Sequence, residues 1–220
     1  MKIVIDADDV LLDSMPTARK MVKEIYPDAD IPETGYASYW PVWGSIGSEE
    51  ARLKFMSAVN EFLHSEHFGK NPAVPGAIEG VKALRAAGHE LYVLTAVGKE
   101  PEIIAKRRQN IENIFGTDVF TDFIGEDRTT PNKGDVMKKI GATVLIDDGL
   151  GHISSALNAG LHGILYKFHG NEKIIDAVMS GSPLPHKLWW TSDTDIIRDK
   201  AIVANNWPEV VAAVEKINNG

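Results

Sequence analysis

Four sets of reactive side chains occur in the 220-residue chain, each where an apolar strand should end or a helix should begin. The first is the run IDADDVLLD at 5–13, which places Asp6, Asp8 and Asp9 directly after the apolar stretch KIVI. Carboxylates this close repel one another unless a cation lies between them. Oxygen ligands without His or Cys nearby suit Mg²⁺, which typically takes one or two carboxylates together with substrate phosphate oxygens. Alternatively, these acids cap a helix or are solvated in a loop.

The other three sets come later in the chain. Thr95 and Ala96 end the stretch LYVLTA, where a hydroxyl could serve catalysis or cap the next helix. Lys133, in PNKGD, comes at the start of a predicted helix, whose amide groups and dipole favour an anion; a surface lysine is the alternative. Asp147 and Asp148 follow the almost wholly apolar TVLI, and paired carboxylates after a buried strand are what a cation site requires.

The elements that would position these side chains alternate between strand and helix. Apolar strands separated by helices predict an α/β fold with a doubly wound parallel sheet covered on both faces. Strands are expected at 2–5, 91–95, 119–124, 143–146 and 163–166, and helices at 76–87, 100–115, 132–140 and 150–159, with a closing helix from Pro208. Ligands bind at the carboxyl ends of the strands in such sheets, so the four sets should meet there. The segment 170–206 is the least readable part of the chain.

Composition limits the possible functions. The chain has 23 Lys+Arg and 31 Asp+Glu, and its net charge of −8 has the wrong sign for a protein that coats nucleic acid. It contains no cysteine, which excludes a disulfide framework, a thiolate nucleophile and Cys-ligated metal centres. No signal-peptide hydrophobic region precedes Asp6, and no run reaches about 18 apolar residues. We therefore expect a cytoplasmic protein with no membrane partner.

The order of the four sets is more specific than any one of them. Asp-x-Asp, Thr, Lys and Asp-Asp follow one another, each after a strand or at a helix start. In these motifs residues 1–166 resemble the haloacid dehalogenase-like phosphohydrolase superfamily. Its first motif, an apolar strand followed by Asp-x-Asp-x-Thr or Val and an apolar pair, matches KIVIDADDVLL at each required position. Response-regulator receiver domains use similar residue types in a different order and do not fit.

This resemblance implies a Mg²⁺-dependent phosphomonoester hydrolase that forms an aspartyl-phosphate. Asp6 would be the nucleophile and a direct Mg²⁺ ligand. Asp8 would protonate the leaving oxygen and then take a proton from water, and its main-chain carbonyl would also bind the metal. Asp9 departs from the pattern, because many members of the superfamily have Gly at this position; Asp tolerates unusual backbone angles better than most residues.

The later motifs would bind the phosphoryl group and complete the metal site. By the same resemblance, Thr95, the amide of Ala96 and Lys133 would hold the phosphoryl oxygens. Asp148 would be the third protein ligand of Mg²⁺. Asp147 would act through water or orient its neighbour.

The resemblance also implies an inserted cap that covers the site and selects the substrate. Residues 14–71, with a helix after Ser14 and another at 48–65 joined by an irregular loop, match that location. The catalytic core would then comprise residues 1–13 and 72–220. The loop contains four aromatic residues: Tyr36, Tyr39, Trp40 and Trp43. Their rings could stack a nucleobase or could instead fill the small core of the cap.

A finer resemblance points to the 5′(3′)-deoxyribonucleotidase branch of the superfamily. It rests on LIDDG, on a strand ending at Tyr166 with His169-Gly170-Asn171 soon after, and on NNWPEV near the end. It implies a nucleoside monophosphate as substrate. The negative net charge argues against stable binding of nucleic acid. His169 and Asn171 could equally be turn residues, and Trp207 a packing anchor. Two other functions stay open: a phosphatase of sugar phosphates or nucleic-acid 3′-phosphate ends, and a catalytically silent protein that holds a phosphorylated ligand.

Overall fold

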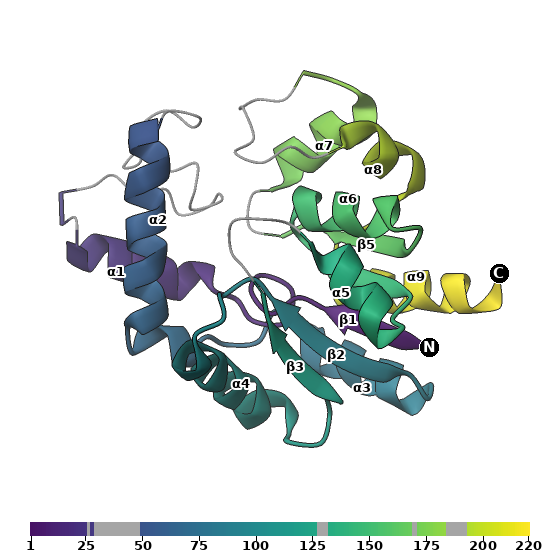
Figure 1. The fold of residues 1–220 in the computed structure, drawn as a ribbon, viewed down its shortest axis with the longest axis horizontal. Helices are drawn as coiled ribbons and strands as arrows, with labels where there is room; N and C mark the ends of the chain where they lie inside the picture. Colours follow the sequence, from purple (N-terminus) through teal and green to yellow (C-terminus); the bar gives the residue numbers. More distant parts are fainter. Residues whose placement is uncertain (26, 29–48, 127–131, 169–170, 184–192) are drawn as a thin grey trace.

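The computed structural model describes residues 1–25, 27–28, 49–126, 132–168, 171–183 and 193–220 (Figure 1). In this part of the chain a six-stranded parallel sheet has the order β3-β2-β1-β4-β5-β6. The strands are β1 (Lys2–Ile5), β2 (Glu90–Thr95), β3 (Asp122–Gly125), β4 (Val144–Asp147), β5 (His162–Tyr166) and β6 (Ile202–Ala204). The predicted doubly wound parallel α/β fold is confirmed.

Helices cover both faces of the sheet, as its sequence pattern requires (Figure 1). One face carries α3 (Ala77–Ala86), α4 (Pro101–Phe115) and α9 (Trp207–Asn219). The other carries α5 (Lys133–Ile140), α6 (Leu150–Asn158), α7 (Glu172–Ser180) and α8 (Thr194–Lys200). Strand β1 supplies both cores in alternation, because Ile3 and Ile5 point to the first face and Val4 to the second. Apolar residues on both sides are typical of such a doubly covered strand.

The strand order reverses between β1 and β4, which lie side by side with Ile3 opposite Val144. In open α/β sheets, the crevice at this reversal is where ligands bind, beyond the carboxyl ends of the strands. The residues that follow β1 and β4 are therefore placed together by the topology alone.

Two parts of the sheet differ from the sequence prediction. Strand β3 begins at Asp122 rather than at residue 119, because Val119 and Phe120 pack against the hydrophobic core instead of pairing with β2. The segment 170–206, the least readable part of the sequence, supplies α7, α8 and β6. Strand β6 has only three residues, too few to show an alternating pattern, and its place in the sheet comes from pairing with β5.

Between β1 and β2 the chain forms α1 (Met15–Ile25), α2 (Glu49–His64) and the short 3₁₀ helix η3 (His67–Gly69). Apolar residues of these three elements pack together and against the first turn of α4. The chain leaves the core and returns at neighbouring points, because the Asp13 amide donates to the Pro72 carbonyl oxygen at 2.8 Å. These points coincide with the predicted limits of the cap, and the division into cap and core stays a prediction.

Candidate active site

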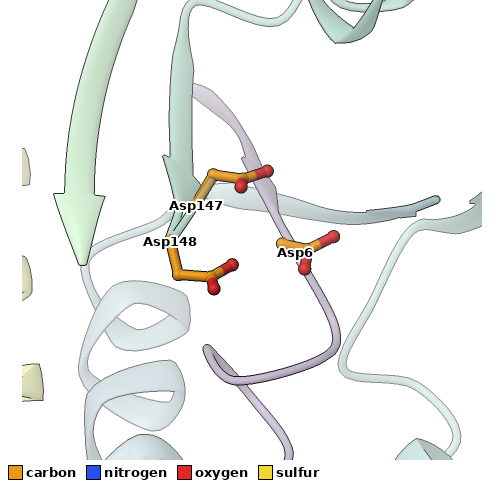
Figure 2. Close-up of side chains that lie close together, drawn as sticks. All are labelled: Asp6, Asp147 and Asp148. Atoms are coloured by element: carbon orange, nitrogen blue, oxygen red, sulfur yellow. The ribbon is translucent and has the colours of Figure 1, made fainter. Parts of the chain in front are cut away.

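Three carboxylates meet where the strand order reverses (Figure 2). One carboxylate oxygen from each of Asp6, Asp147 and Asp148 lies within 4.8 Å of the other two, and all three residues are buried. Asp6 follows β1 directly, and its amide donates to the carbonyl oxygen of Ile146 at 3.0 Å. Asp147 is the last residue of β4. The structure thus brings together Asp6 of the first motif and Asp147 of the last, which are 141 positions apart along the chain.

Lys133 lies inside this cluster. Its Nζ is 2.5 Å from Oδ1 of Asp6 and 2.6 Å from Oδ2 of Asp147, and the residue is completely buried. The alternative of a surface lysine is therefore wrong. Close packing of α5 on α6 places it here, because a Cβ at Gly134 would lie 2.4 Å from the Ser155 carbonyl oxygen. Burial would lower the pKa of Lys133, but the charges of Asp147 and Asp6 outweigh burial and raise the pKa.

The charges of this cluster favour a cation. When ionised, the three carboxylates and the Lys133 ammonium add up to a net charge of −2. Burial raises the pKa of Asp6 and of Asp147, while Lys133 acts in the opposite direction on both. A divalent cation would offset the remaining charge, and an all-oxygen donor set suits Mg²⁺. The residues present therefore fit the metal that the sequence led us to expect.

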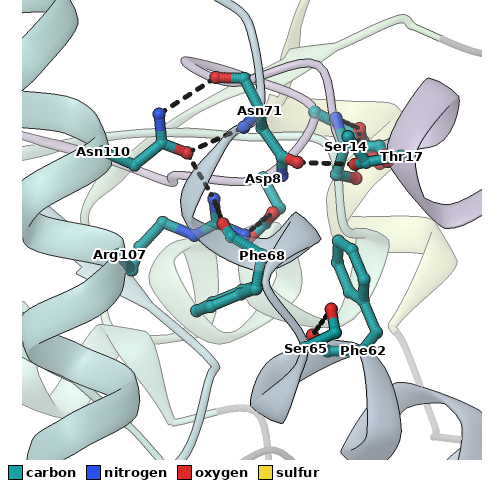
Figure 3. A network of polar contacts seen from close by, with 10 residues as sticks. Asp8, Ser14, Thr17, Phe62, Ser65, Phe68, Asn71, Arg107 and Asn110 are labelled. Atoms are coloured by element: carbon teal, nitrogen blue, oxygen red, sulfur yellow. Dashed lines mark hydrogen bonds and ion pairs between the residues drawn. The ribbon is translucent and has the colours of Figure 1, made fainter. Parts of the chain in front are cut away.

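Asp8 lies beside this cluster and is paired with an arginine that none of the sequence motifs contains. Its Oδ1 accepts a hydrogen bond from Nη2 of Arg107 at 2.6 Å; the Asp8 side chain is 29% exposed and that of Arg107 fully buried (Figure 3). Burial raises the pKa of Asp8, and Arg107 opposes this effect. Ile103, Arg107 and Ile111 follow helical spacing on the buried face of α4. A charged residue in step with the apolar residues Ile103 and Ile111 was the signal that could have identified Arg107.

Thr95 ends β2 at the same edge of the sheet and is buried, and Ala96 follows it. Thr95 does not cap the next helix, because α4 begins only at Pro101, after Glu100. Four predicted substrate residues and two residues of the nucleotidase-like motif lie outside the described residues: Tyr36, Tyr39, Trp40, Trp43, His169 and Gly170.

The backbone at Asp9 has a conformation that few residues other than glycine adopt. Asp9 has a φ of 60°, in the left-handed region that favours glycine. Its Oδ1 accepts hydrogen bonds from the amide of Ser14 at 3.1 Å and from the Ser14 hydroxyl at 2.7 Å. The side chain thus links the turn after Asp6 to the residue that precedes α1.

Two residues near the C-terminal side support the loops of the site. The side-chain Nδ2 of Asn171 donates to the carbonyl oxygens of Asp148 at 3.4 Å and Tyr166 at 3.1 Å, so Asn171 connects the chain ends of β4 and β5. Trp207 is completely buried, which confirms it as a packing anchor, and its Nε1 donates to the Val10 carbonyl oxygen at 3.0 Å. Asn171 thus holds the backbone of the predicted metal ligand Asp148, and Trp207 holds the backbone that follows Asp8 and Asp9.

Solved structures identify the fold. A hydrolase of the haloacid dehalogenase-like family from Streptococcus pneumoniae matches with a TM-score of 0.61, covering 97% of each chain at 15% identity. The chain has the fold of the haloacid dehalogenase-like hydrolases. A predicted phosphoglycolate phosphatase from Haemophilus somnus matches with a TM-score of 0.55 and 15% identity, over 98% of this chain and 96% of that protein.

A third match with this haloacid dehalogenase-like fold has another activity in its name. L-2-haloacid dehalogenase from Xanthobacter autotrophicus, with chloropropionic acid covalently bound, has a TM-score of 0.57 and 13% identity, over 97% of this chain and 98% of that protein. No family model and no curated protein sequence matches the chain. Within the described residues, none of the helices is both long enough and apolar enough to cross a membrane.

Proposed function

We propose that this protein is a Mg²⁺-dependent phosphomonoester hydrolase that works through an aspartyl-phosphate on Asp6. The observation behind the proposal is the cluster of Asp6, Asp147 and Asp148 around the buried Lys133. Its carboxylates favour a hard divalent cation, and its ammonium can bind a phosphoryl oxygen. The phosphatase described for the Haemophilus match, which has the same fold, supports this reading.

In the first step, one oxygen of Asp6 attacks phosphorus while the bond from phosphorus to the substrate's leaving oxygen breaks. Asp8 gives its proton to that leaving oxygen, so the alcohol departs and the phosphoryl group stays on Asp6. Burial raises the pKa of Asp8, which favours the protonated form needed at this point.

In the second step, a water oxygen attacks the phosphorus of the aspartyl-phosphate. Asp8, now a carboxylate, takes the proton of that water. The bond between phosphorus and the Asp6 oxygen breaks, which restores the carboxylate and releases inorganic phosphate. Arg107 pairs with the ionised Asp8 and stabilises the form that acts as a base.

Asp6, Asp148 and the main-chain carbonyl of Asp8 would hold Mg²⁺, which supplies positive charge next to the phosphoryl oxygens when it is bound. We assign the direct contact to Asp148 rather than to Asp147. The oxygens of Asp147 are already engaged by protein donors, Oδ2 by Lys133 and Oδ1 by the amide of Gly149 at 2.8 Å.

The remaining residues would orient the phosphoryl group. Asp147 fixes the ammonium of Lys133 near Asp6, where it can bind a phosphoryl oxygen. The hydroxyl of Thr95 and the amide of Ala96, at the end of the neighbouring strand β2, would donate to the other phosphoryl oxygens.

For the substrate we propose a nucleoside monophosphate, on the strength of the aromatic residues at 36–43 and the nucleotidase-like motifs. The Haemophilus match favours a second candidate, a small phosphate without a base, such as a sugar phosphate. Dehalogenation, the activity of the Xanthobacter match, ranks lower. A halide leaves without a proton, so neither Asp8 as an acid nor a cation would be needed.

Phosphate release is the direct test. Deoxy- and ribonucleoside monophosphates and sugar phosphates would be supplied to the wild type and to Asp6→Asn, with Mg²⁺ and with EDTA. We expect release that requires Mg²⁺ and that Asp6→Asn reduces by more than about 10³-fold. Equal release by the two proteins would refute the mechanism. Release from sugar phosphates alone would keep the mechanism and discard the nucleotide.

Two further measurements complete this test. Asp118→Asn, at an exposed position, is the matched control and should release phosphate at the wild-type rate. Borohydride reduction during turnover should convert an aspartyl-phosphate at Asp6 to homoserine, which peptide mass spectrometry detects. Binding of a nucleotide without release of phosphate from any substrate would instead favour the catalytically silent protein.

A further inference from the structure

Arg107 links Asp8 to the segment by which the chain returns from the inserted helices (Figure 3). Its Nη2 donates to Oδ1 of Asp8 at 2.6 Å, and its Nη1 donates to the carbonyl oxygen of Phe68 at 2.9 Å. The guanidinium also lies 3.6 Å from the centre of the Phe68 ring. Burying a cation this completely is costly unless it is paired and hydrogen-bonded. The position of Arg107 is therefore set by contacts with Asp8 and Phe68.

The same face of α4 also binds the next residues of the return segment. Oδ1 of Asn110 accepts a hydrogen bond from the amide of Asn71 at 3.0 Å, and Nδ2 of Asn110 donates to the carbonyl oxygen of Asn71 at 3.0 Å. Nη1 of Arg107 is 3.3 Å from Oδ1 of Asn110. Helix α4 thus provides a binding surface for residues 68–71, and Arg107 is part of that surface while it contacts Asp8.

The inserted helices contact this binding surface through Phe68. The Phe68 ring packs edge-on against Phe62 of α2, with 5.6 Å between ring centres, and belongs to one apolar cluster with residues of α1 and α2. A displacement of these helices would therefore move the carbonyl oxygen and the ring that hold Arg107. Arg107 would transmit that displacement to the carboxyl group of Asp8.

We propose that Arg107 is a positioning residue for Asp8, and that it couples the orientation of the acid–base carboxyl group to the position of residues 68–71 on α4. This inference rests on the proposed function. Arg107 holds Oδ1 of Asp8, which leaves Oδ2 as the oxygen that exchanges the proton. A carboxyl group held by one oxygen keeps the other in a defined place, as proton transfer requires.

The experiment separates proton donation from the rest of the reaction by changing the leaving group. Values of kcat/KM report the steps up to formation of the aspartyl-phosphate. They would be measured for the best alkyl phosphomonoester of the substrate panel and for 4-nitrophenyl phosphate, whose leaving group departs without a proton. We expect Arg107→Met to lower kcat/KM about 100-fold on the alkyl ester and less than about 5-fold on the aryl ester.

Arg108→Met is the matched control, because Arg108 is on the same helix, is 55% exposed and pairs with Glu112 instead of Asp8. It should leave both values unchanged. Phe68→Leu tests the coupling: it removes the ring beneath the guanidinium but keeps Asp8 and Arg107. We expect the same selective loss on the alkyl ester, about 5- to 10-fold.

The outcomes distinguish this inference from the proposed function. Equal losses on the two esters in Arg107→Met would show a merely structural role and overturn the inference, while the hydrolase itself stands. If Phe68→Leu shows no selective loss of kcat/KM on the alkyl ester, the proposed coupling is refuted. No phosphate release by the wild type would overturn both proposals. If Arg107→Met does not fold, Arg107→Lys replaces it. Lysine keeps the charge, but its single nitrogen cannot replace both the Nη2 contact with Asp8 and the Nη1 contact with Phe68. We then expect a selective loss of about 10-fold on the alkyl ester, and equal losses on the two esters would refute the inference.

Discussion

The ammonium of Lys133 lies 2.6 Å from Oδ2 of Asp147, and Asp147 is completely buried. The other oxygen of Asp147 accepts from the Gly149 amide at 2.8 Å. Asp148, the next residue, is in the same carboxylate cluster and keeps 8% of its surface exposed. Two adjacent residues of one type are thus given different environments, because consecutive side chains at a strand end point in different directions.

This difference predicts different effects of removing each charge. Asp148→Asn should raise the Mg²⁺ concentration for half-maximal activity by at least about 10-fold, because a proposed direct ligand is lost. Asp147→Asn should lower kcat at saturating Mg²⁺ by about 10- to 100-fold, because Lys133 loses a partner that orients it. Titration of activity with Mg²⁺ measures both effects. The reverse pattern would exchange the roles of Asp147 and Asp148, and Asp118→Asn again serves as the control.

The close contact between Gly80 and Trp207 predicts that a side chain at position 80 would destabilise the fold. A Cβ at Gly80 of α3 would lie 2.2 Å from Cε3 of the buried Trp207. We expect Gly80→Ala to lower the free energy of unfolding by about 1–3 kcal/mol, although alanine favours helix. Urea unfolding measures this. In the control Gly69→Ala the new Cβ would meet the flexible Lys106 side chain at 3.1 Å, so a smaller change is expected; equal changes would contradict the steric explanation.

The left-handed backbone at Asp9 predicts an order of stability among its variants. Asp9→Ala loses both hydrogen bonds from Ser14, so it should be less stable than the wild type by about 2 kcal/mol, and like Asp9 it has a Cβ at a φ of 60°. Asp9→Gly loses the same bonds but removes the steric cost. It should therefore be more stable than Asp9→Ala by about 1 kcal/mol. Thermal or urea unfolding of the two variants would show this order, and an Ala variant as stable as the Gly variant would contradict it.

Because His152 is buried, we expect the folded protein to lose stability in weak acid. Burial, with a further contribution from the charge of Lys133, lowers the pKa of His152 from 6.5 to about 3 in the folded protein. Between these values the unfolded chain binds a proton that the folded protein does not. The stability is therefore complete above about pH 6.5 and decreases as the pH falls, by up to about 1.4 kcal/mol per pH unit for this group.

Urea unfolding in EDTA at about pH 7 and about pH 5.5 tests this slope. His152→Gln should lose less stability than the wild type between the two conditions, because the titrating group is gone. His162→Gln, on an exposed strand end, is the matched control. If His152→Gln and the wild type lose the same stability, another group is responsible for the slope.

Much of the fold was predictable because local patterns and topology agree. Short apolar strands between helices already implied a parallel sheet, and ligand sites in such sheets lie at strand ends, so Asp6 and Asp148 could be expected to meet. Edge elements were less predictable. The start of β3 and the three-residue strand β6 depend on which neighbouring strand is available for pairing, which local sequence does not report.

By itself, the sequence determined which reactive groups stand at strand ends and helix starts, because hydrophobic periodicity and helix signals are local properties of the chain. Only the tertiary structure decided which of these groups touch. Asp8 and Arg107 are 99 positions apart, and their pairing depends on how α4 packs against the return segment. The same holds for the partners of Lys133, because they are set by the close approach of α5 to α6 and not by the residues beside it in the chain.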